Sequence, residues 1–204
     1  MVSGVHYLHS LGVVHRDLKL DNILLSVKGP EATVKIADFG LSALVRLGSD
    51  GYVGGNTQGD SEKRKRYKGL VDMWGTKEYF APEMIDQAYG PQADVWALGC
   101  ILYELLCGHY AFPNYKSRSQ QQGDADLYGR IHAVKYKTDQ YDLPSRTPEV
   151  MDLMSKMLVR DPVARYRYEL YYYYYYYYCS LVMAVLTHRP VTVSPISLMN
   201  TQCL

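Results

Sequence analysis

The stretch His-Arg-Asp-Leu-Lys-Leu-Asp-Asn at residues 15–22 constrains the fold more than any other part of the chain. It lies between two different periodic patterns. Residues 2–11 have a helical apolar period that ends at Gly12, whereas short β-type runs occupy 23–25 and 34–37. A chance polar turn after a helix is the alternative interpretation, and the motifs that follow along the chain argue against it.

This stretch resembles the catalytic loop of protein kinases, H-R-D-L-x-x-x-N. The resemblance implies that Asp17 orients the attacking hydroxyl and accepts its proton, because phosphoryl transfer requires little other covalent work from the protein. It also implies that Lys19 lies near the transferred phosphoryl group and that Asn22 reaches a magnesium ion. In this family, a Lys two residues after the Asp is typical of serine/threonine specificity.

Further motifs follow in the order that the family has. Residues 38–40 resemble the D-F-G motif, in which Asp38 would bind magnesium because a hard dication prefers oxygen ligands. Residues 81–83 resemble A-P-E. Just before them, Thr76 lies in a segment that resembles C-G-T-P-E-Y, and it would hydrogen-bond Lys19 and Asp17. The implied catalytic residues are Asp17, Lys19, Asn22 and Thr76, the implied ATP-binding residues are Lys19, Asn22 and Asp38, and the implied Mg²⁺ ligands are Asn22 and Asp38.

Two structural roles are also implied by the resemblance. Asp94 begins a segment that resembles the buried helix of the kinase C-lobe, where the Asp anchors the backbone of the catalytic loop. Arg165 follows Asp161-Pro162 as in the segment whose Arg pairs with the Glu of A-P-E, here Glu83. The sequence departs from the family pattern at Trp74, where a small residue is usual, and at Lys77, where Pro is usual. Both departures lie where a peptide substrate would dock, so they leave substrate preference open.

The resemblance covers about residues 1–168, and the wording L-K-L-D-N and I-A-D-F-G-L-S looks like the calcium/calmodulin-dependent kinase group. We therefore expect an α+β fold, namely a kinase-like C-lobe that is mainly α-helical, with a small β-element at the catalytic loop and no N-lobe. The Gly-rich loop, the V-A-I-K lysine and the αC glutamate of the N-lobe have no counterpart before residue 15.

This expected absence leads to two functional hypotheses. The first is a serine/threonine protein kinase that transfers the ATP γ-phosphate to a protein hydroxyl, represented by a truncated chain with negligible activity and weak nucleotide binding of its own. The second is a non-catalytic binding or scaffold protein derived from a kinase C-lobe. The intact Asp17 and Asp38 favour the first. Without an N-lobe, Leu24, Leu25 and Ile36 would form an exposed apolar face.

Apolar spacing predicts the remaining helices. Residues 94–107 are apolar almost all round, which indicates burial on every side. A short helix is expected at 126–135, and another at 147–159 with Pro148 at its first helical position. After about residue 168 the character changes to a tyrosine run and an aperiodic tail, so we interpret 169–204 as low-complexity, unstructured sequence.

Net charge and cysteine spacing limit the cellular compartments and the classes of partner that we expect for this protein. The formal net charge of +1 supports neither nucleic acid nor membrane partners, and no basic region with an apolar core marks a signal peptide. The four cysteines have no CxxC spacing, which argues against a zinc site or a disulfide framework and fits a reducing compartment. We expect a protein substrate and a cytoplasmic location, with the nucleus as an alternative, and leave calmodulin binding open.

Regulation and substrate choice can be inferred less directly. Arg16 normally requires an anion from the activation segment, and Asp72 stands where many relatives have a phosphothreonine; a solvated loop Asp is the alternative. Asp21 and Glu104 stand where basophilic kinases bind substrate arginines, because carboxylates pair with Arg through two parallel hydrogen bonds. An ordinary helix charge is the alternative for Glu104.

The long segment before Thr76 contains a basic cluster, Lys63-Arg64-Lys65-Arg66, followed by Lys68. A solvated loop is one interpretation, and a docking or nuclear-targeting patch is the other. Ser49, Thr57 and Ser61 are candidate phosphorylation sites among which the sequence does not choose.

Overall fold

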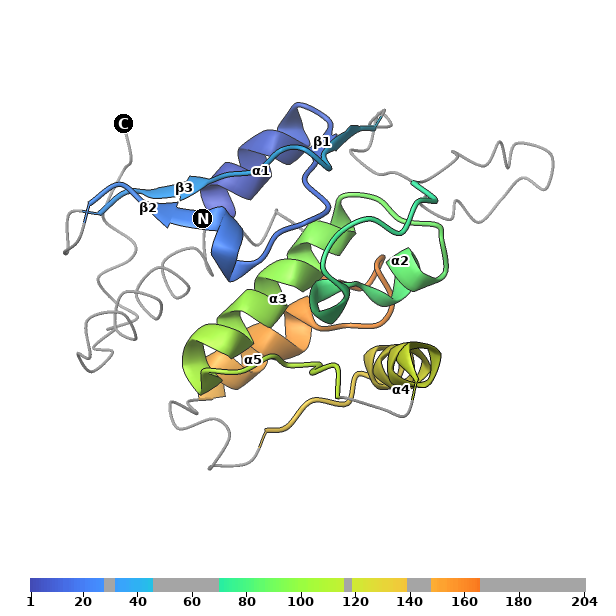
Figure 1. Cartoon of the computed structure of the whole chain (residues 1–204). Coiled ribbons are helices and arrows are strands. Elements are labelled where there is room, and N and C mark those ends of the chain that lie inside the picture. The colour runs from blue at the N-terminus through green and yellow to red at the C-terminus, as the bar shows by residue number, and fades with distance from the viewer. Residues whose placement is uncertain (28–31, 46–69, 116–118, 139–147, 166–204) are drawn as a thin grey trace.

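The computed structural model describes residues 1–27, 32–45, 70–115, 119–138 and 148–165 (Figure 1). Several predicted features lie outside these residues: the basic cluster at 63–66 with Lys68, the candidate phosphorylation sites at 49, 57 and 61, and the tail at 169–204. Two pairs of strands lie on one side of a helical body, and the long helix α3 (Gln92–Cys107) runs through that body (Figure 1).

The strands form two separate antiparallel pairs. β1 (Val13–Val14) pairs with β4 (Ala43–Leu44), and β2 (Ile23–Leu25) pairs with β3 (Val34–Ile36). The β2–β3 pair is local in sequence, whereas β1 and β4 are far apart in the chain and meet only in the folded structure.

The predicted fold class is wrong in its β part. We expected a small β-element and no N-lobe, but β1–β4 lie within 13–44, ahead of α2–α5, and form an N-lobe-like β region. Sequence periodicity does not reveal β1 and β4, because a two-residue strand has too few positions to alternate, and each of these strands exists only through its partner. The predicted apolar face is exposed at Leu24 and Leu25, whereas Ile36 packs against the core.

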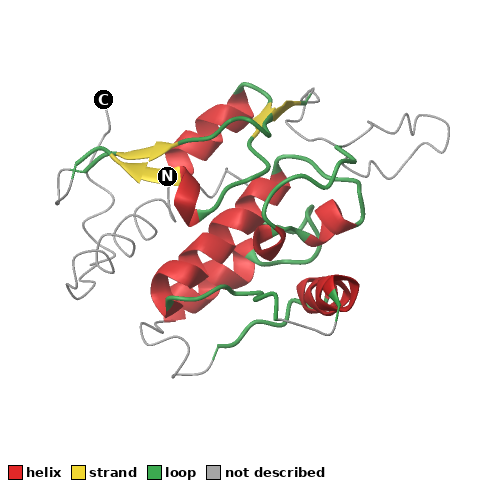
Figure 2. Cartoon of the chain, viewed as in Figure 1, coloured by secondary structure: helices red, strands yellow, loops and turns green. Residues whose placement is uncertain are grey.

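The core is built around α3. Trp96, Ile101 and Leu102 of this helix have no exposed surface, in agreement with the predicted burial on every side. Burying each such side chain contributes about 1.5–3 kcal/mol relative to an exposed one. Helix α5 (Pro148–Met157), within the helix predicted at 147–159, lies alongside α3 (Figure 2). Its apolar side chains are all buried: Val150, Leu153, Met154 and Met157, with Leu158 just after the helix.

Three further helices complete the described body. α1 (Val2–Ser10) precedes β1, α2 (Pro82–Ile85) begins at the predicted A-P-E segment, and α4 (Gln120–His132) begins earlier than the predicted residue 126. The earlier start of α4 follows from its cap, because the hydroxyl of Ser119 accepts a hydrogen bond from a backbone N–H of the first turn at 3.2 Å. None of the described helices combines the length and the apolar character needed to cross a bilayer.

Candidate functional site

The backbone of the predicted catalytic loop is held by Asp94, the buried residue near the start of α3. Its carboxylate accepts hydrogen bonds from the backbone N–H groups of His15 at 2.8 Å and Arg16 at 3.0 Å. The ring of His9 from α1 lies 2.7 Å from the same carboxylate. Arg16 has a left-handed backbone with φ of 71°, which a residue with a side chain adopts only when its surroundings hold it there. Asp94 supplies that restraint.

Asp17, Lys19 and Thr76 meet in one hydrogen-bonded group. The Asp17 carboxylate accepts from both the backbone N–H and the hydroxyl of Thr76, each at 2.9 Å. The Lys19 amine donates to the Thr76 hydroxyl at 3.0 Å and lies 3.1 Å from the second carboxylate oxygen of Asp17. The Thr76 hydroxyl therefore accepts from the amine while donating to the carboxylate, and it holds the two charged groups at a fixed separation.

Asn22 belongs to the same group from its other side. It ends the short 3₁₀ turn η1 (Leu20–Asn22) and is buried. Its amide nitrogen donates to the backbone carbonyl of Asp17 at 2.8 Å and to the carboxylate of Asp17 at 3.3 Å. Because the nitrogen is committed to Asp17, the oxygen of the amide is the atom that Asn22 can offer to a cation.

Strand pairing places Asp38 near this group. Asn22 directly precedes β2 and Ala37 directly follows β3, and the N–H of Ala37 donates to the carbonyl of Asn22 at 2.9 Å. The ring of His15 lies 2.9 Å from the carbonyl of Ala37, so the catalytic loop is also tied to this position. Asp38 is the next residue, and its φ of 59° turns the chain away from the strand. The hairpin thus brings an amide and a carboxylate to one end of the β2–β3 pair.

The amide oxygen of Asn22 and the carboxylate oxygens of Asp38 are ligands of the kind that magnesium prefers. Mg²⁺ binds through one or two carboxylates together with phosphates and waters. Within the described residues, no group of three or more His, Cys, Asp and Glu side chains is arranged to hold a metal ion. Asn22 and Asp38 supply only an incomplete set of ligands, and this suits a metal that shares its coordination sphere with a bound nucleotide rather than a closed protein site.

A second group of polar residues surrounds Glu104 in the last turn of α3. Tyr79, which ends the 3₁₀ turn η2 (Lys77–Tyr79), donates its hydroxyl to the Glu104 carboxylate. Burial raises the pKa of Glu104, the hydrogen bond from Tyr79 opposes the rise, and the nearby charge of Asp21 adds to it. The two acids predicted for substrate recognition therefore lie close enough to interact. Tyr79 was not predicted, because no spacing in the sequence links it to Glu104.

Lys77, one of the two departures from the family pattern, forms an ion pair across to α4. Its amine lies 2.5 Å from the carboxylate of Asp124, which also accepts from Gln120 at 3.1 Å and from Asn114 at 3.4 Å. The hydrogen bond from Lys77 is the main cause that lowers the pKa of Asp124. Trp74, the other departure, is 54% exposed. Sequence reasoning did not find Asp124, which lies in a helix that was predicted to begin after it.

The predicted contact between Arg16 and the Asp72 carboxylate has no counterpart in the hydrogen bonds of the structure. The Nε of Arg16 donates to the backbone carbonyl of Leu41. Among the described residues, Asp72 forms no ion pair with Arg16, and its backbone carbonyl accepts instead from the hydroxyl of Tyr89 at 2.7 Å. The segment around Asp72 is therefore held through its backbone.

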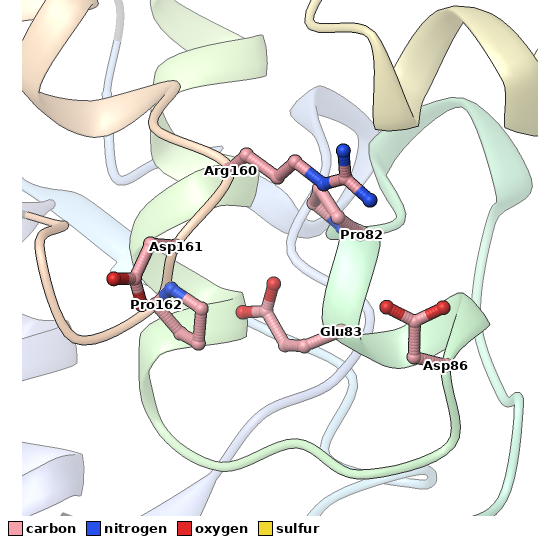
Figure 3. Close-up of a pocket in the computed structure, with 6 residues that line it drawn as sticks. All are labelled: Pro82, Glu83, Asp86, Arg160, Asp161 and Pro162. Carbon is pink, nitrogen blue, oxygen red and sulfur yellow. The ribbon is translucent and has the colours of Figure 1, made fainter.

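The pair implied between Arg165 and Glu83 is present. Both residues are buried, and the guanidinium and the carboxylate make two parallel contacts, one of them at 2.8 Å. Beside this pair lies a cavity of about 330 Å³, shown in Figure 3. None of the predicted catalytic residues lines it. Its lining residues are Pro82, Glu83, Asp86, Arg160, Asp161 and Pro162.

The chain is similar in sequence to known protein kinases. The family model described as "Protein kinase domain" matches residues 1–173. "Calcium-dependent protein kinase 17" of Arabidopsis thaliana is 37% identical over 165 residues, which cover 81% of this chain and 26% of that protein. "Calcium-dependent protein kinase 28" of Oryza sativa subsp. japonica is 34% identical over 166 residues, with coverages of 81% and 27%. "Probable serine/threonine-protein kinase fhkE" of Dictyostelium discoideum is 34% identical over 173 residues, with coverages of 81% and 21%.

These matches bear on the predictions in different ways. The resemblance to calcium-dependent serine/threonine kinases is confirmed. The expected absence of an N-lobe is corrected, because the family match begins at residue 1 and includes the β region at 13–44. The predicted inactivity rested partly on that absence, and the assay proposed below tests it. The boundary at 168 between a domain and a tail stays a prediction. The chain spans about a quarter of the length of these curated relatives.

Proposed function

The chain belongs to the protein kinase family, and from this premise we propose that it transfers the γ-phosphate of ATP to a serine or threonine hydroxyl of a protein substrate. The observation that carries the proposal is the hydrogen-bonded group of Asp17, Lys19 and Thr76. It combines a carboxylate, an amine and a hydroxyl that fixes their separation, which is the chemical equipment that phosphoryl transfer requires.

Asp17 is the proposed acceptor of the proton. The substrate hydroxyl forms a new bond from its oxygen to the γ-phosphorus, the bond from that phosphorus to the bridging oxygen breaks, and ADP leaves. The hydroxyl proton passes to the carboxylate of Asp17, which Thr76 orients through two hydrogen bonds of 2.9 Å. Lys19 lies 3.1 Å from the same carboxylate and neutralises negative charge that develops on the transferred group.

Asn22 and Asp38 are the proposed ligands of Mg²⁺, and Lys19, Asn22 and Asp38 are the proposed ATP-binding residues. When bound, the ion neutralises charge on the nucleotide phosphates and fixes their orientation. The protein contributes the amide oxygen of Asn22, whose nitrogen is held by Asp17, and the carboxylate of Asp38 at the end of the β2–β3 hairpin. The Asn22 side chain, a proposed metal ligand, is thereby hydrogen-bonded to the proposed base Asp17.

Asp21 and Glu104 are the proposed acids for a basic side chain of the substrate upstream of the phosphorylated residue. Their charges interact, since Asp21 contributes to the raised pKa of Glu104. A guanidinium placed between them relieves this repulsion and forms bidentate hydrogen bonds. A Glu104→Gln variant should therefore raise the KM for an Arg-containing peptide while leaving the KM for ATP unchanged.

The proposed activity can be measured with the purified chain, Mg²⁺, ATP labelled in its γ-phosphate and a serine peptide that contains upstream arginines. The expected result is transfer of label by the natural sequence and loss of transfer in an Asp17→Asn variant. Asp126→Asn is the matched control, because Asp126 is an exposed acid of α4 outside the proposed site. Label transfer that is equal in the natural chain and in Asp17→Asn would refute the proposed role of the base. Absence of transfer from a folded natural chain would favour the scaffold alternative.

A further inference from the structure

Tyr89 belongs to no predicted motif, and yet it organises the segment that leads to the site. It lies between α2 and α3 and is 2% exposed. Its backbone forms an isolated antiparallel bridge with Leu70: the N–H of Leu70 donates to the carbonyl of Tyr89 at 2.9 Å, and the N–H of Tyr89 donates back at 3.1 Å. The bridge thus ties the segment that begins at residue 70 to Tyr89 through its backbone.

The side chain of Tyr89 makes a second contact with the same segment. Its hydroxyl donates to the backbone carbonyl of Asp72 at 2.7 Å, and the N–H of Trp74 donates to that carbonyl at 3.1 Å. Burial raises the pKa of Tyr89, while the guanidinium of Arg16 beside it opposes the rise. The hydroxyl consequently keeps its proton at neutral pH and serves as a donor.

The segment continues directly to the residue that contacts the proposed base. Gly75 has a φ of 118°, and a Cβ at that position would lie 2.6 Å from the carbonyl oxygen of Arg16. The chain therefore passes close to the backbone of Arg16 at Gly75, and Thr76 follows directly with its two hydrogen bonds to Asp17. Three residues separate Asp72 from Thr76, so a displacement at Asp72 is expected to reach Thr76.

We propose that Tyr89 is a positioning residue for the phosphoacceptor site. Tyr89 holds residues 70–74 so that Thr76 is presented to the carboxylate of Asp17. The inference deepens the proposed function and rests on it. The sequence suggests that the side chain of Asp72 anchors this segment. In the inference, the backbone carbonyl of Asp72 has that role, through its hydrogen bond with Tyr89. Tyr89 acts through Thr76 and does not itself contact a substrate.

The test compares Tyr89→Phe with Tyr136→Phe in the purified chain. Tyr136 is a partly buried tyrosine that packs against Tyr103 and Phe112, so its substitution makes the same chemical deletion away from the site. Hydrogen exchange at the amides of Trp74 and Thr76 is the first readout and does not depend on activity. In Tyr89→Phe, the expected result is faster exchange at both amides. In Tyr136→Phe, exchange should keep its natural rate. A third variant, Asp72→Ala, should also exchange at the natural rate, because it retains the backbone carbonyl that Tyr89 contacts.

The second readout is steady-state kinetics. Loss of one buried neutral hydrogen bond should lower kcat about fivefold, with the KM for ATP unchanged, in Tyr89→Phe alone. Unchanged exchange at Trp74 and Thr76 in Tyr89→Phe would overturn the inference, and so would faster exchange in Asp72→Ala. If the natural chain transfers no phosphate, the proposed function fails, while the exchange comparison still decides whether Tyr89 holds this segment.

Discussion

The hydroxyl of Thr76 lies 2.9 Å from the carboxylate of Asp17, although 59 positions separate the two residues in the chain. The backbone N–H of Thr76 contacts the same oxygen at the same distance. A proton-accepting carboxylate at the end of a turn could rotate freely, but here two donors from another segment set its orientation. The geometry of the proposed catalytic group therefore depends on the segment that carries Thr76 as much as on the loop that carries Asp17.

Thr76→Val should lower kcat strongly, because it removes the hydroxyl that bridges Asp17 and Lys19 and leaves only the backbone N–H. A hydrogen bond to a charged group contributes about 1.5–3 kcal/mol, which corresponds to a loss of about 10–100-fold. Thr76→Ser retains the hydroxyl and should keep most of the activity. Peptide phosphorylation at saturating ATP measures the difference, and equal kcat values for the Val and Ser variants would contradict this role.

Gly99→Ala should destabilise the fold, because its Cβ would lie 2.9 Å from a methyl carbon of Leu158 and 3.0 Å from the Cβ of Met157. Contact with α5 leaves no room for the added methyl group, and overpacking of this kind costs about 1–3 kcal/mol. Gly129→Ala in α4 is the control, since nothing lies within 4 Å of an added Cβ there. That change should stabilise the helix by about 0.5–1 kcal/mol. Urea unfolding of the two variants should shift the midpoint in opposite directions.

Glu104 should make the free energy of unfolding depend on pH. Because burial raises the pKa of Glu104, the folded state binds a proton that the unfolded state releases from about pH 4.5 upward. This contribution to stability is present at lower pH and is lost as pH rises from the unfolded pKa through the folded one. Glu104→Gln cannot ionise and should not show the loss. Urea midpoints at pH 4 and pH 7 test it, and a parallel decline in both proteins would exclude Glu104 as the cause.

The ion pair between Lys77 and Asp124 should contribute a small, salt-sensitive coupling between η2 and α4. A double-mutant cycle with Lys77→Met and Asp124→Asn measures the coupling through the free energy of unfolding. It should be favourable at low ionic strength and shrink in high salt. The pair Lys156–Asp152, which lies within the single helix α5, serves as a reference that does not link two elements. A coupling that is indifferent to salt would show that packing, not charge, joins the two elements.

Much of the site could be predicted from local sequence. Asp17, Lys19 and Asn22 are close in the chain, so a single turn places them together, and the β2–β3 hairpin brings Asp38 to the same end. The buried helix around Trp96 could also be predicted, because its apolar residues leave no polar face. Family resemblance added the pairs Thr76–Asp17 and Glu83–Arg165, whose members are remote in sequence.

The remaining features were decided by contacts that no local pattern encodes. β1 and β4 are strands only because residues 13–14 and 43–44 lie side by side, and this corrects the expected fold class. Tyr79 contacts Glu104, Asp124 contacts Lys77, and Tyr89 contacts the carbonyl of Asp72 for the same reason. Local spacing determines which side chains share a turn or a helix face. The packing of whole elements determines which distant donor meets which acceptor, because a hydrogen bond requires both atoms within about 3 Å.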